Sequence, residues 1–151
     1  APFPIRRRCF AVRPFRKRRM NPNRLAKVLA LFLGFAGIMH FANPSFFNEI
    51  VPPWLPPNPE FWTYISGVAE IAVAVALIRP STRRAGAIAA AWLFIAVYPA
   101  NIYMVWDWRN EAASQQFISW ARLPFQFLFI WAALQVSRVN NNHPIAPGDI
   151  S

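Results

Sequence analysis

The chain carries little charge and almost no cysteine for its length. Only 15% of its 151 residues are charged, whereas a soluble domain usually has about 25%. Its single cysteine, Cys9, excludes an internal disulfide and a cysteine-built metal site. No GxGxxG, Walker A or nucleophile-elbow motif is present, and the His, Cys, Asp and Glu residues do not follow metal-ligand spacing. These absences argue against an enzyme that works alone and against a cofactor or metal held by this chain's own motifs.

Hydrophobic sequence is abundant instead, at 56% of residues, and it is concentrated in four segments. These segments are Leu25–Phe41, Trp62–Ile78, Ala85–Trp106 and Leu123–Val136. A hydrocarbon core about 30 Å thick needs roughly 20 apolar residues per helix. In lipid the backbone must satisfy its own hydrogen bonds, which favours helices. The sequence therefore predicts an all-α fold, a polytopic membrane four-helix bundle over residues 25–138.

The positive charge is concentrated ahead of the first apolar segment. Ten of the sixteen basic residues lie between Arg6 and Lys27, and the net charge is +10. Basic loops mark the cytoplasmic side of a membrane, and the first predicted outer loop, 42–61, has acidic residues and no basic one. We therefore expect a bacterial-type plasma (inner) membrane protein with both termini cytoplasmic. Its partner is the lipid bilayer and not a nucleic acid, since a basic tail beside a membrane helix needs no nucleic-acid role.

The two ends of the chain are expected to be disordered. Residues 1–24 form a basic, proline-punctuated tail, and residues 139–151 are rich in Asn, Pro and Gly. Arg7-Arg8-Cys9-Phe10 is weakly similar to a twin-arginine signal. The first apolar segment is not followed by an Ala-x-Ala cleavage site, so we interpret it as a retained span. Whether residues 1–19 belong to the mature protein is left open.

Polar residues inside the predicted spans fall at one depth. An acidic or basic group at mid-span costs roughly 2.5–3.5 kcal/mol on insertion scales, which makes Glu70 the most informative residue. Helical spacing places the whole set in the outer half of the bilayer. The predicted polar layer consists of His40, Ser66, Glu70, Asn101, Arg122 and Gln126. Every span contributes to this layer, whereas the inner half of the third span is rich in Ala and Gly and is expected to pack tightly.

Two interpretations of this layer are open. In one, Glu70 and His40 are the candidate catalytic residues and handle protons, while Arg122 fixes charge. In the other, Glu70 and Arg122 form a structural ion pair. For Asn101 and Gln126 an interhelical hydrogen-bonding role is favoured. Pro99 lies within the third span, where it removes a backbone hydrogen bond near this layer.

The first outer loop contains six prolines between large apolar residues. The prolines argue against a regular helix there. So much apolar surface is not typical of a solvated linker. We expect the loop to lie in the headgroup zone and cap the bundle, with a lid over a lipid-like ligand as the alternative.

Five motifs, in order across the four spans, resemble those of small DoxX-like membrane proteins. They are Phe35-Ala36-Gly37-Ile38-Met39-His40-Phe41 with Pro44, Ile50-Val51-Pro52-Pro53-Trp54-Leu55-Pro56, Ser66-Gly67-Val68-Ala69-Glu70, Pro99-Ala100-Asn101-Ile102-Tyr103-Met104 and Arg122-Leu123-Pro124-Phe125-Gln126. The resemblance implies a four-helix inner-membrane bundle. Some relatives are subunits of a thiosulfate:quinone oxidoreductase, and others are tied to redox maturation or stress tolerance. The chain lacks the paired cysteines that thiol chemistry would need.

The resemblance and the polar layer together favour an accessory subunit of a quinone-linked membrane redox system. A quinone would be its cofactor, and a membrane or periplasmic redox protein would supply the electron carrier. The alternatives are a non-catalytic scaffold or assembly factor and, less favoured, a small transporter. The oligomeric state, the substrate and the partner protein are not determined by the sequence.

Overall fold

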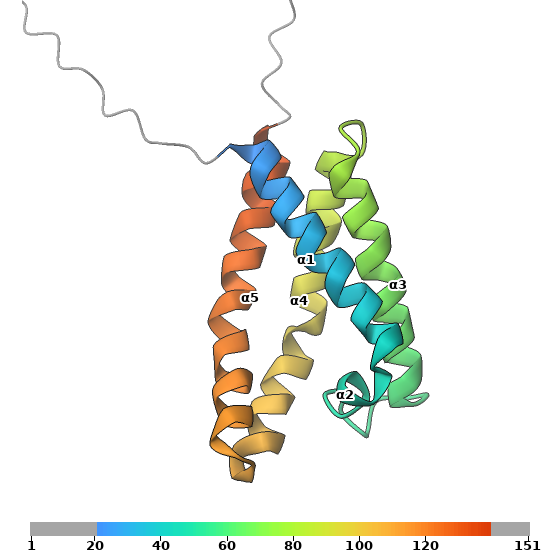
Figure 1. Ribbon diagram of the computed structural model, residues 1–151, viewed down its shortest axis with the longest axis vertical. Helices are drawn as coiled ribbons and strands as arrows, with labels where there is room; N and C mark the ends of the chain where they lie inside the picture. Colours follow the sequence, from blue (N-terminus) through green and yellow to red (C-terminus); the bar gives the residue numbers. More distant parts are fainter. Residues whose placement is uncertain (1–20, 140–151) are drawn as a thin grey trace, which may run out of the picture.

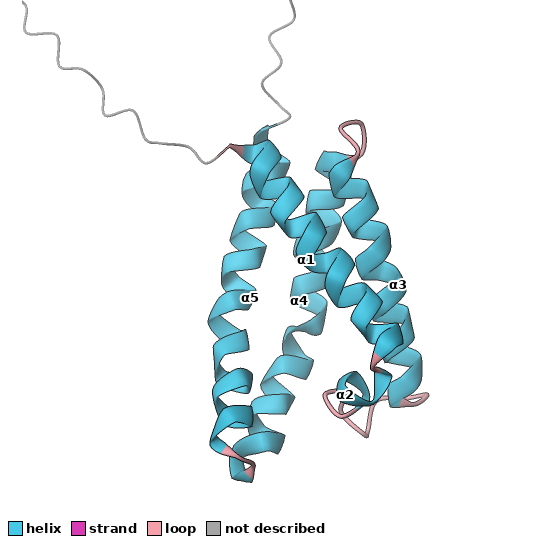
Figure 2. Ribbon diagram, in the orientation of Figure 1, coloured by secondary structure: helices cyan, strands magenta, loops and turns pink. Residues whose placement is uncertain are grey.

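The computed structural model describes residues 21–139, which form four long helices and two short ones (Figure 2). Between residues 21 and 139 the chain has no strand, so the predicted all-α four-helix bundle is confirmed. The predicted basic and C-terminal tails, with Cys9, lie almost entirely outside the described residues. The elements are α1 (Pro22–Ala42), α2 (Pro44–Asn48), α3 (Pro59–Ile78), α4 (Arg83–Asp107), the 3₁₀ helix η1 (Trp108–Asn110) and α5 (Ala113–Val139).

The first three helices begin with the same dipeptide, Asn-Pro. Proline is suited to the first helical turn because it has no N–H and its φ is already helical. Asn21 caps α1 by accepting a hydrogen bond from the Asn23 N–H at 3.0 Å, and Asn58 caps α3 by accepting from the Phe61 N–H at 2.8 Å. Asn43 precedes Pro44 at the start of α2 without such a side-chain bond. These Asn-Pro dipeptides therefore set the residues at which α1, α2 and α3 begin.

The long helices run alternately up and down, so α1 begins and α5 ends at the same end of the bundle (Figure 1). We call this the termini end, and the opposite end, where α2 and η1 lie, the α2 end. α1 starts beside α5 and crosses to pack along α3, while α4 packs along α5 (Figure 1). The helices therefore form two close pairs that meet mainly at the termini end.

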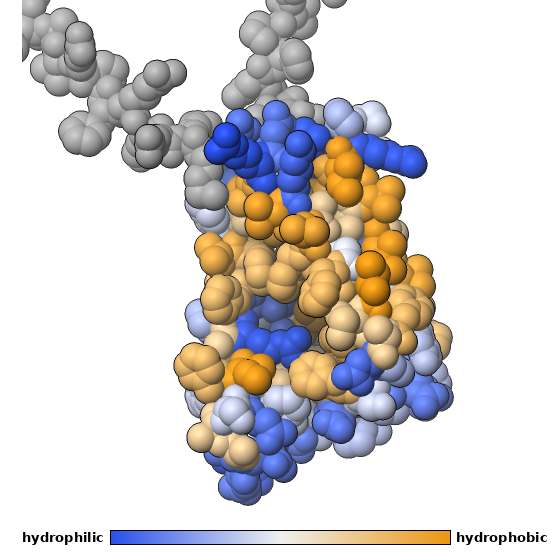
Figure 3. Space-filling model, viewed as in Figure 1, coloured by the Kyte–Doolittle hydropathy of each residue, from blue (hydrophilic) through white to orange (hydrophobic). Residues whose placement is uncertain are grey.

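The surface has the layering of a membrane protein. A hydrophobic band encircles the visible face, with hydrophilic residues gathered at both ends (Figure 3). All four long helices are long and apolar enough to cross a bilayer, and their outward faces carry large apolar side chains such as Leu31, Trp92 and Phe127. The protein is therefore a multi-pass membrane protein.

The termini end is closed by a close-packed apolar core. Small side chains let the backbones approach, as in other membrane bundles. A Cβ atom on Gly86 would lie 2.9 Å from the backbone of Ala76, so α4 touches α3 there directly. The core comprises Leu25, Ala26, Leu29, Ala30, Leu33, Ala74, Leu77, Ala87, Ala90, Ala91, Phe94, Ala132, Ala133 and Val136. The expected tight packing of this half is therefore present.

Two sequence-based boundaries need correction. The fourth span was expected to start at Leu123, with Arg122 at its edge, but α5 begins at Ala113. Arg122 and Pro124 suggest a helix start, yet both lie inside α5, and Arg122 faces a cavity. The first outer loop was expected to contain no regular helix, but it includes the five-residue α2. Proline is compatible with that helix because Pro44 occupies its first position.

Candidate functional site

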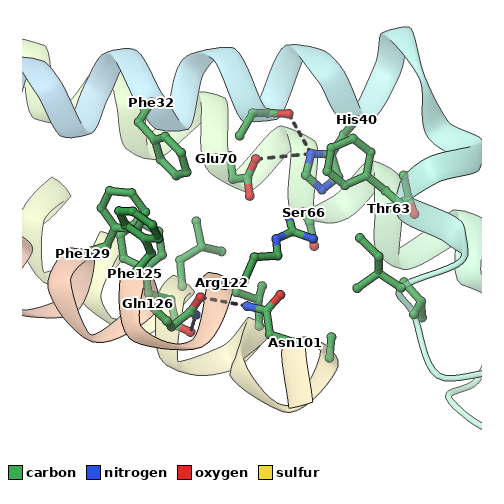
Figure 4. A pocket seen from close by; sticks show the side chains of 18 of the residues that line it. Phe32, His40, Thr63, Ser66, Glu70, Asn101, Arg122, Phe125, Gln126 and Phe129 are labelled. Atoms are coloured by element: carbon green, nitrogen blue, oxygen red, sulfur yellow. Dashed lines mark hydrogen bonds and ion pairs between the residues drawn. The ribbon is translucent and has the colours of Figure 1, made fainter. Parts of the chain in front are cut away.

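A cavity of about 520 Å³ lies between the helices in the half of the bundle nearer the α2 end. This volume is within the range of about 300–1,000 Å³ that small-molecule sites occupy. All six residues of the predicted polar layer line it, although they come from four different helices (Figure 4). The remainder of the wall is largely apolar and aromatic. Such an arrangement, a few convergent polar groups in an apolar pocket, is typical of a ligand site.

Glu70 on α3 and His40 on α1 face each other across the close α1–α3 contact. The His40 Nδ1 atom lies 2.8 Å from the Ala36 carbonyl oxygen and 3.3 Å from Glu70 Oε2. A carbonyl oxygen only accepts hydrogen bonds, so Nδ1 carries a hydrogen, and the shorter contact takes it. Glu70 Oε2 is buried and has no hydrogen-bond partner among the described residues. A buried acceptor without a donor is uncommon in native proteins and calls for an explanation.

Arg122 reaches from α5 into the cavity, on the side of Ser66 and below Glu70 (Figure 4). Among the described residues, Arg122 Nη1 donates a hydrogen bond to the Met104 sulfur at 3.3 Å, and a thioether sulfur is a weak acceptor. A guanidinium has five N–H donors, so most of this group's hydrogen-bonding capacity is unused by the residues described between 21 and 139. In the described residues the direct ion pair of Glu70 with Arg122 that the sequence left open is not formed, and the basic side chain within 4 Å of Glu70 is His40, at 3.3 Å.

Asn101 and Gln126 join α4 to α5 at the floor of the cavity. The Asn101 amide donates to Gln126 Oε1 at 2.8 Å, and the Gln126 amide donates to the Phe94 carbonyl oxygen. Both side chains are buried. Pro99 lies on the same stretch of α4 and cannot donate to the turn before it. The structure thus brings these two residues into the interhelical contact that was favoured for them.

The segment around α2 forms a roof over the cavity. The Phe47 ring stacks on His40 with centroids 3.7 Å apart, and Thr63 donates to Asn48 Oδ1 at 2.7 Å, which ties α2 to α3. Ile50 packs with Met104 and Trp108 in a second buried apolar cluster. Phe47 and Ile50 of this proline-rich loop therefore cover the cavity, whereas Trp54 of the same loop is exposed.

Several residues of the site were missed by the sequence reasoning. Thr63 lies three residues before Ser66 and seven before Glu70, so its helical spacing could have placed it on the same face. The aromatic side chains gave no such signal, because aromatic residues occur throughout the chain. The aromatic rings that line the cavity belong to Phe32, Phe47, Trp62, Phe94, Phe117, Phe125 and Phe129. In the described part of the chain, no three His, Cys, Asp or Glu residues are grouped so that they could hold a metal ion.

The bundle and its cavity define a multi-pass helical membrane protein with a polar pocket inside the membrane-spanning region. Residues 29–137 match the family described as a domain of unknown function, DUF8561, and the chain belongs to that family. No curated protein and no solved structure matches the chain.

Proposed function

We propose that this protein binds a quinone-class headgroup in its cavity, as a DoxX-like accessory subunit of a membrane redox system. A membrane or periplasmic redox protein is the partner that supplies the electron carrier. The observation that carries the proposal is the unsatisfied hydrogen bonding at opposite sides of one cavity. Glu70 Oε2 lacks a donor, and Arg122 contacts only a weak acceptor among the described residues.

The two groups match the two redox forms of such a ligand. A quinone carries two carbonyl oxygens that accept hydrogen bonds, and its reduced form carries two hydroxyl groups that also donate. Arg122 donates to an oxygen in either form, whereas a Glu70 carboxylate accepts from the hydroxyl of the reduced form. When bound, the quinone supplies two-electron, two-proton redox chemistry. In this scheme Glu70, with His40 beside it at 3.3 Å, holds or releases a proton at the headgroup.

The replacement Glu70→Gln is expected to weaken binding of the reduced quinone about tenfold or more, because only that form donates a hydroxyl hydrogen to the carboxylate. A hydrogen bond to a charged group contributes about 1.5–3 kcal/mol, and each 1.4 kcal/mol is about tenfold in Kd. The reduced form of a benzoquinone bearing one isoprenoid unit can be titrated, without oxygen, into the protein in lipid nanodiscs. Binding is measured as quenching of tryptophan fluorescence, since Trp62 lines the cavity.

The matched control is Glu60→Gln, which makes the same change in the first turn of α3, outside the cavity. We expect its Kd to equal that of the wild type. Equal quenching in the wild type and Glu70→Gln would overturn the proposal, as would no saturable quenching in the wild type. In either case the bundle is better interpreted as a scaffold.

We also propose that the termini end faces the cytoplasm of a bacterial-type cell. Arg79 follows α3, and Arg83 and Arg84 are the first residues of α4, all at this end, whereas Glu49 and Glu60 lie toward the α2 end. Basic loops favour the cytoplasmic side. Alkaline phosphatase fused after residue 151 is expected to be inactive, and the same enzyme inserted after Trp54 is expected to be active. The reverse result would invert the orientation.

A further inference from the structure

The cavity is closed at both ends of the bundle. Toward the termini end it stops at the apolar core, which contains mainly Ala and Leu side chains and, in the described residues, no charged group. Toward the α2 end the roof of Phe47 and Ile50 covers it, and the buried Met104 and Trp108 side chains pack with Ile50. A polar solute in water therefore has no path along the bundle axis that avoids displacing packed side chains.

The side between α1 and α5 is different. Among neighbouring long helices, these two have the least extensive contact, because α1 crosses away from α5 toward α3 (Figure 1). Near the middle of the two helices, the Phe32 and Phe129 rings stack with centroids 4.3 Å apart and join α1 to α5. Beyond this pair, toward the α2 end, hydrophilic atoms are visible through a hollow in the hydrophobic face between the same helices (Figure 3).

The residues at this hollow line the cavity and are also exposed to the outside. Phe32 on α1 is 42% exposed, and Ile118 and Phe125 on α5 are 45% and 55% exposed. Because the hollow lies within the hydrophobic band, these rim residues face lipid and not water. The rim is entirely apolar, whereas the wall behind it holds Glu70 and Arg122.

We infer that the cavity opens sideways into the bilayer through a portal between α1 and α5, and that its ligand is an amphipathic, lipid-soluble molecule that enters from the membrane. The polar head of the ligand lies among Glu70, Arg122 and Ser66. Its apolar tail leaves past Phe32 and Phe125 into the lipid. This inference rests on the proposed function for the identity of the head, and it adds the route of entry and the requirement for a tail.

Collision measurements on a spin label inside the cavity test the portal without any ligand. In a Cys9→Ser background, nitroxide is attached at Ser66→Cys, and its accessibility is measured to oxygen, which concentrates in the bilayer, and to a charged nickel chelate, which stays in water. Ile65→Cys, which faces lipid on the same turn, and Glu60→Cys, at the exposed start of α3, are the references. We expect label 66 to resemble label 65, with high oxygen and low nickel accessibility.

Each other outcome overturns the inference. High nickel accessibility at position 66 would show that the cavity opens to water at the α2 end, and low accessibility to both reagents would show that it is sealed. A further pair of variants tests the portal without moving the label. Phe125→Trp, which narrows the rim, is expected to lower oxygen accessibility at label 66, whereas Phe127→Trp, exposed on the same helix but not lining the cavity, leaves it unchanged.

The same samples separate this inference from the proposed function. Adding a quinone with a long isoprenoid tail to the bilayer is expected to reduce oxygen collisions at label 66, because the head and tail fill the cavity and portal. If the labels show a lateral portal but the quinone changes nothing, the portal stands and the quinone assignment is wrong. If the quinone protects label 66 while nickel still reaches it, the quinone site stands and the lateral route is wrong.

Discussion

Replacing Arg122 with methionine is expected to lower the free energy of unfolding by about 3 kcal/mol. Breaking a buried charge pair costs about 3–5 kcal/mol because the remaining charge is left without compensation. Arg122 and Glu70 line the same cavity without a direct ion pair between them in the described residues, so we expect the lower end of that range. Methionine keeps an unbranched apolar stem like that of arginine and removes the charged guanidinium. Equilibrium unfolding in mixed micelles of rising sodium dodecyl sulfate content measures the difference.

The double variant Glu70→Gln/Arg122→Met identifies the cause. If the isolated Glu70 charge is responsible, the double variant is more stable than Arg122→Met alone, because no uncompensated carboxylate remains. The matched control is Arg109→Met, which changes an exposed arginine on η1 that stacks over Trp106. We expect Arg109→Met to lower the free energy of unfolding by less than about 1 kcal/mol, as for other exposed charges. Equal effects of Arg122→Met in the presence and absence of Glu70 would show that the two charges are not coupled.

Replacing Gln126 with leucine is expected to lower the free energy of unfolding by about 2 kcal/mol. The change removes the hydrogen bonds to Asn101 and to the Phe94 carbonyl, and it leaves the buried Asn101 amide without the bond to Gln126. Single interhelical bonds in membranes contribute about 0.6 kcal/mol on average and up to about 1.7. Gln126 makes two such bonds, and they lie close to Pro99, where α4 lacks a backbone hydrogen bond. We therefore expect a loss of stability at the upper end of this range or slightly above it.

The control for this prediction is Gln116→Leu, since Gln116 also makes two hydrogen bonds but at the exposed turn between η1 and α5. Water can replace those bonds, so we expect a loss of less than about 1 kcal/mol. The variant Asn101→Leu/Gln126→Leu is expected to recover part of the lost stability, because it removes the buried Asn101 amide that has lost its hydrogen-bond partner. If Gln126→Leu is no less stable than Gln116→Leu, the pair on the floor of the cavity does not hold α4 to α5.

The polar layer shows how far helical spacing alone can lead. Helix rise and the span boundaries placed His40, Ser66, Glu70, Asn101, Arg122 and Gln126 at one depth, and the structure brings all six to one cavity. That step succeeded because a polar group in a membrane helix is expensive unless it faces inward. The pairing within the layer did not follow from depth, because depth does not determine the rotation of one helix against another. Glu70 meets His40 and not Arg122 for this reason.

The fourth helix shows where sequence reasoning misleads. Arginine and proline close together suggest the start of a helix, yet Arg122 and Pro124 are both inside α5. The arginine is accommodated because a cavity with an acidic residue faces it. That cavity is a property of four helices together, so no local pattern in α5 could have indicated it.

The sequence by itself determined that this is a four-helix membrane protein, where three of its spans lie and which residues form a polar layer. It did so because the bilayer imposes helix length, apolar composition and inward-facing polar groups on any spanning chain. Only the tertiary structure decided that α1 leans away from α5, that α2 forms a roof, and that Glu70 and Arg122 keep unused hydrogen-bonding capacity toward one cavity. Those features depend on crossing angles and side-chain packing between distant segments, which set the shape of the cavity and its proposed opening to lipid.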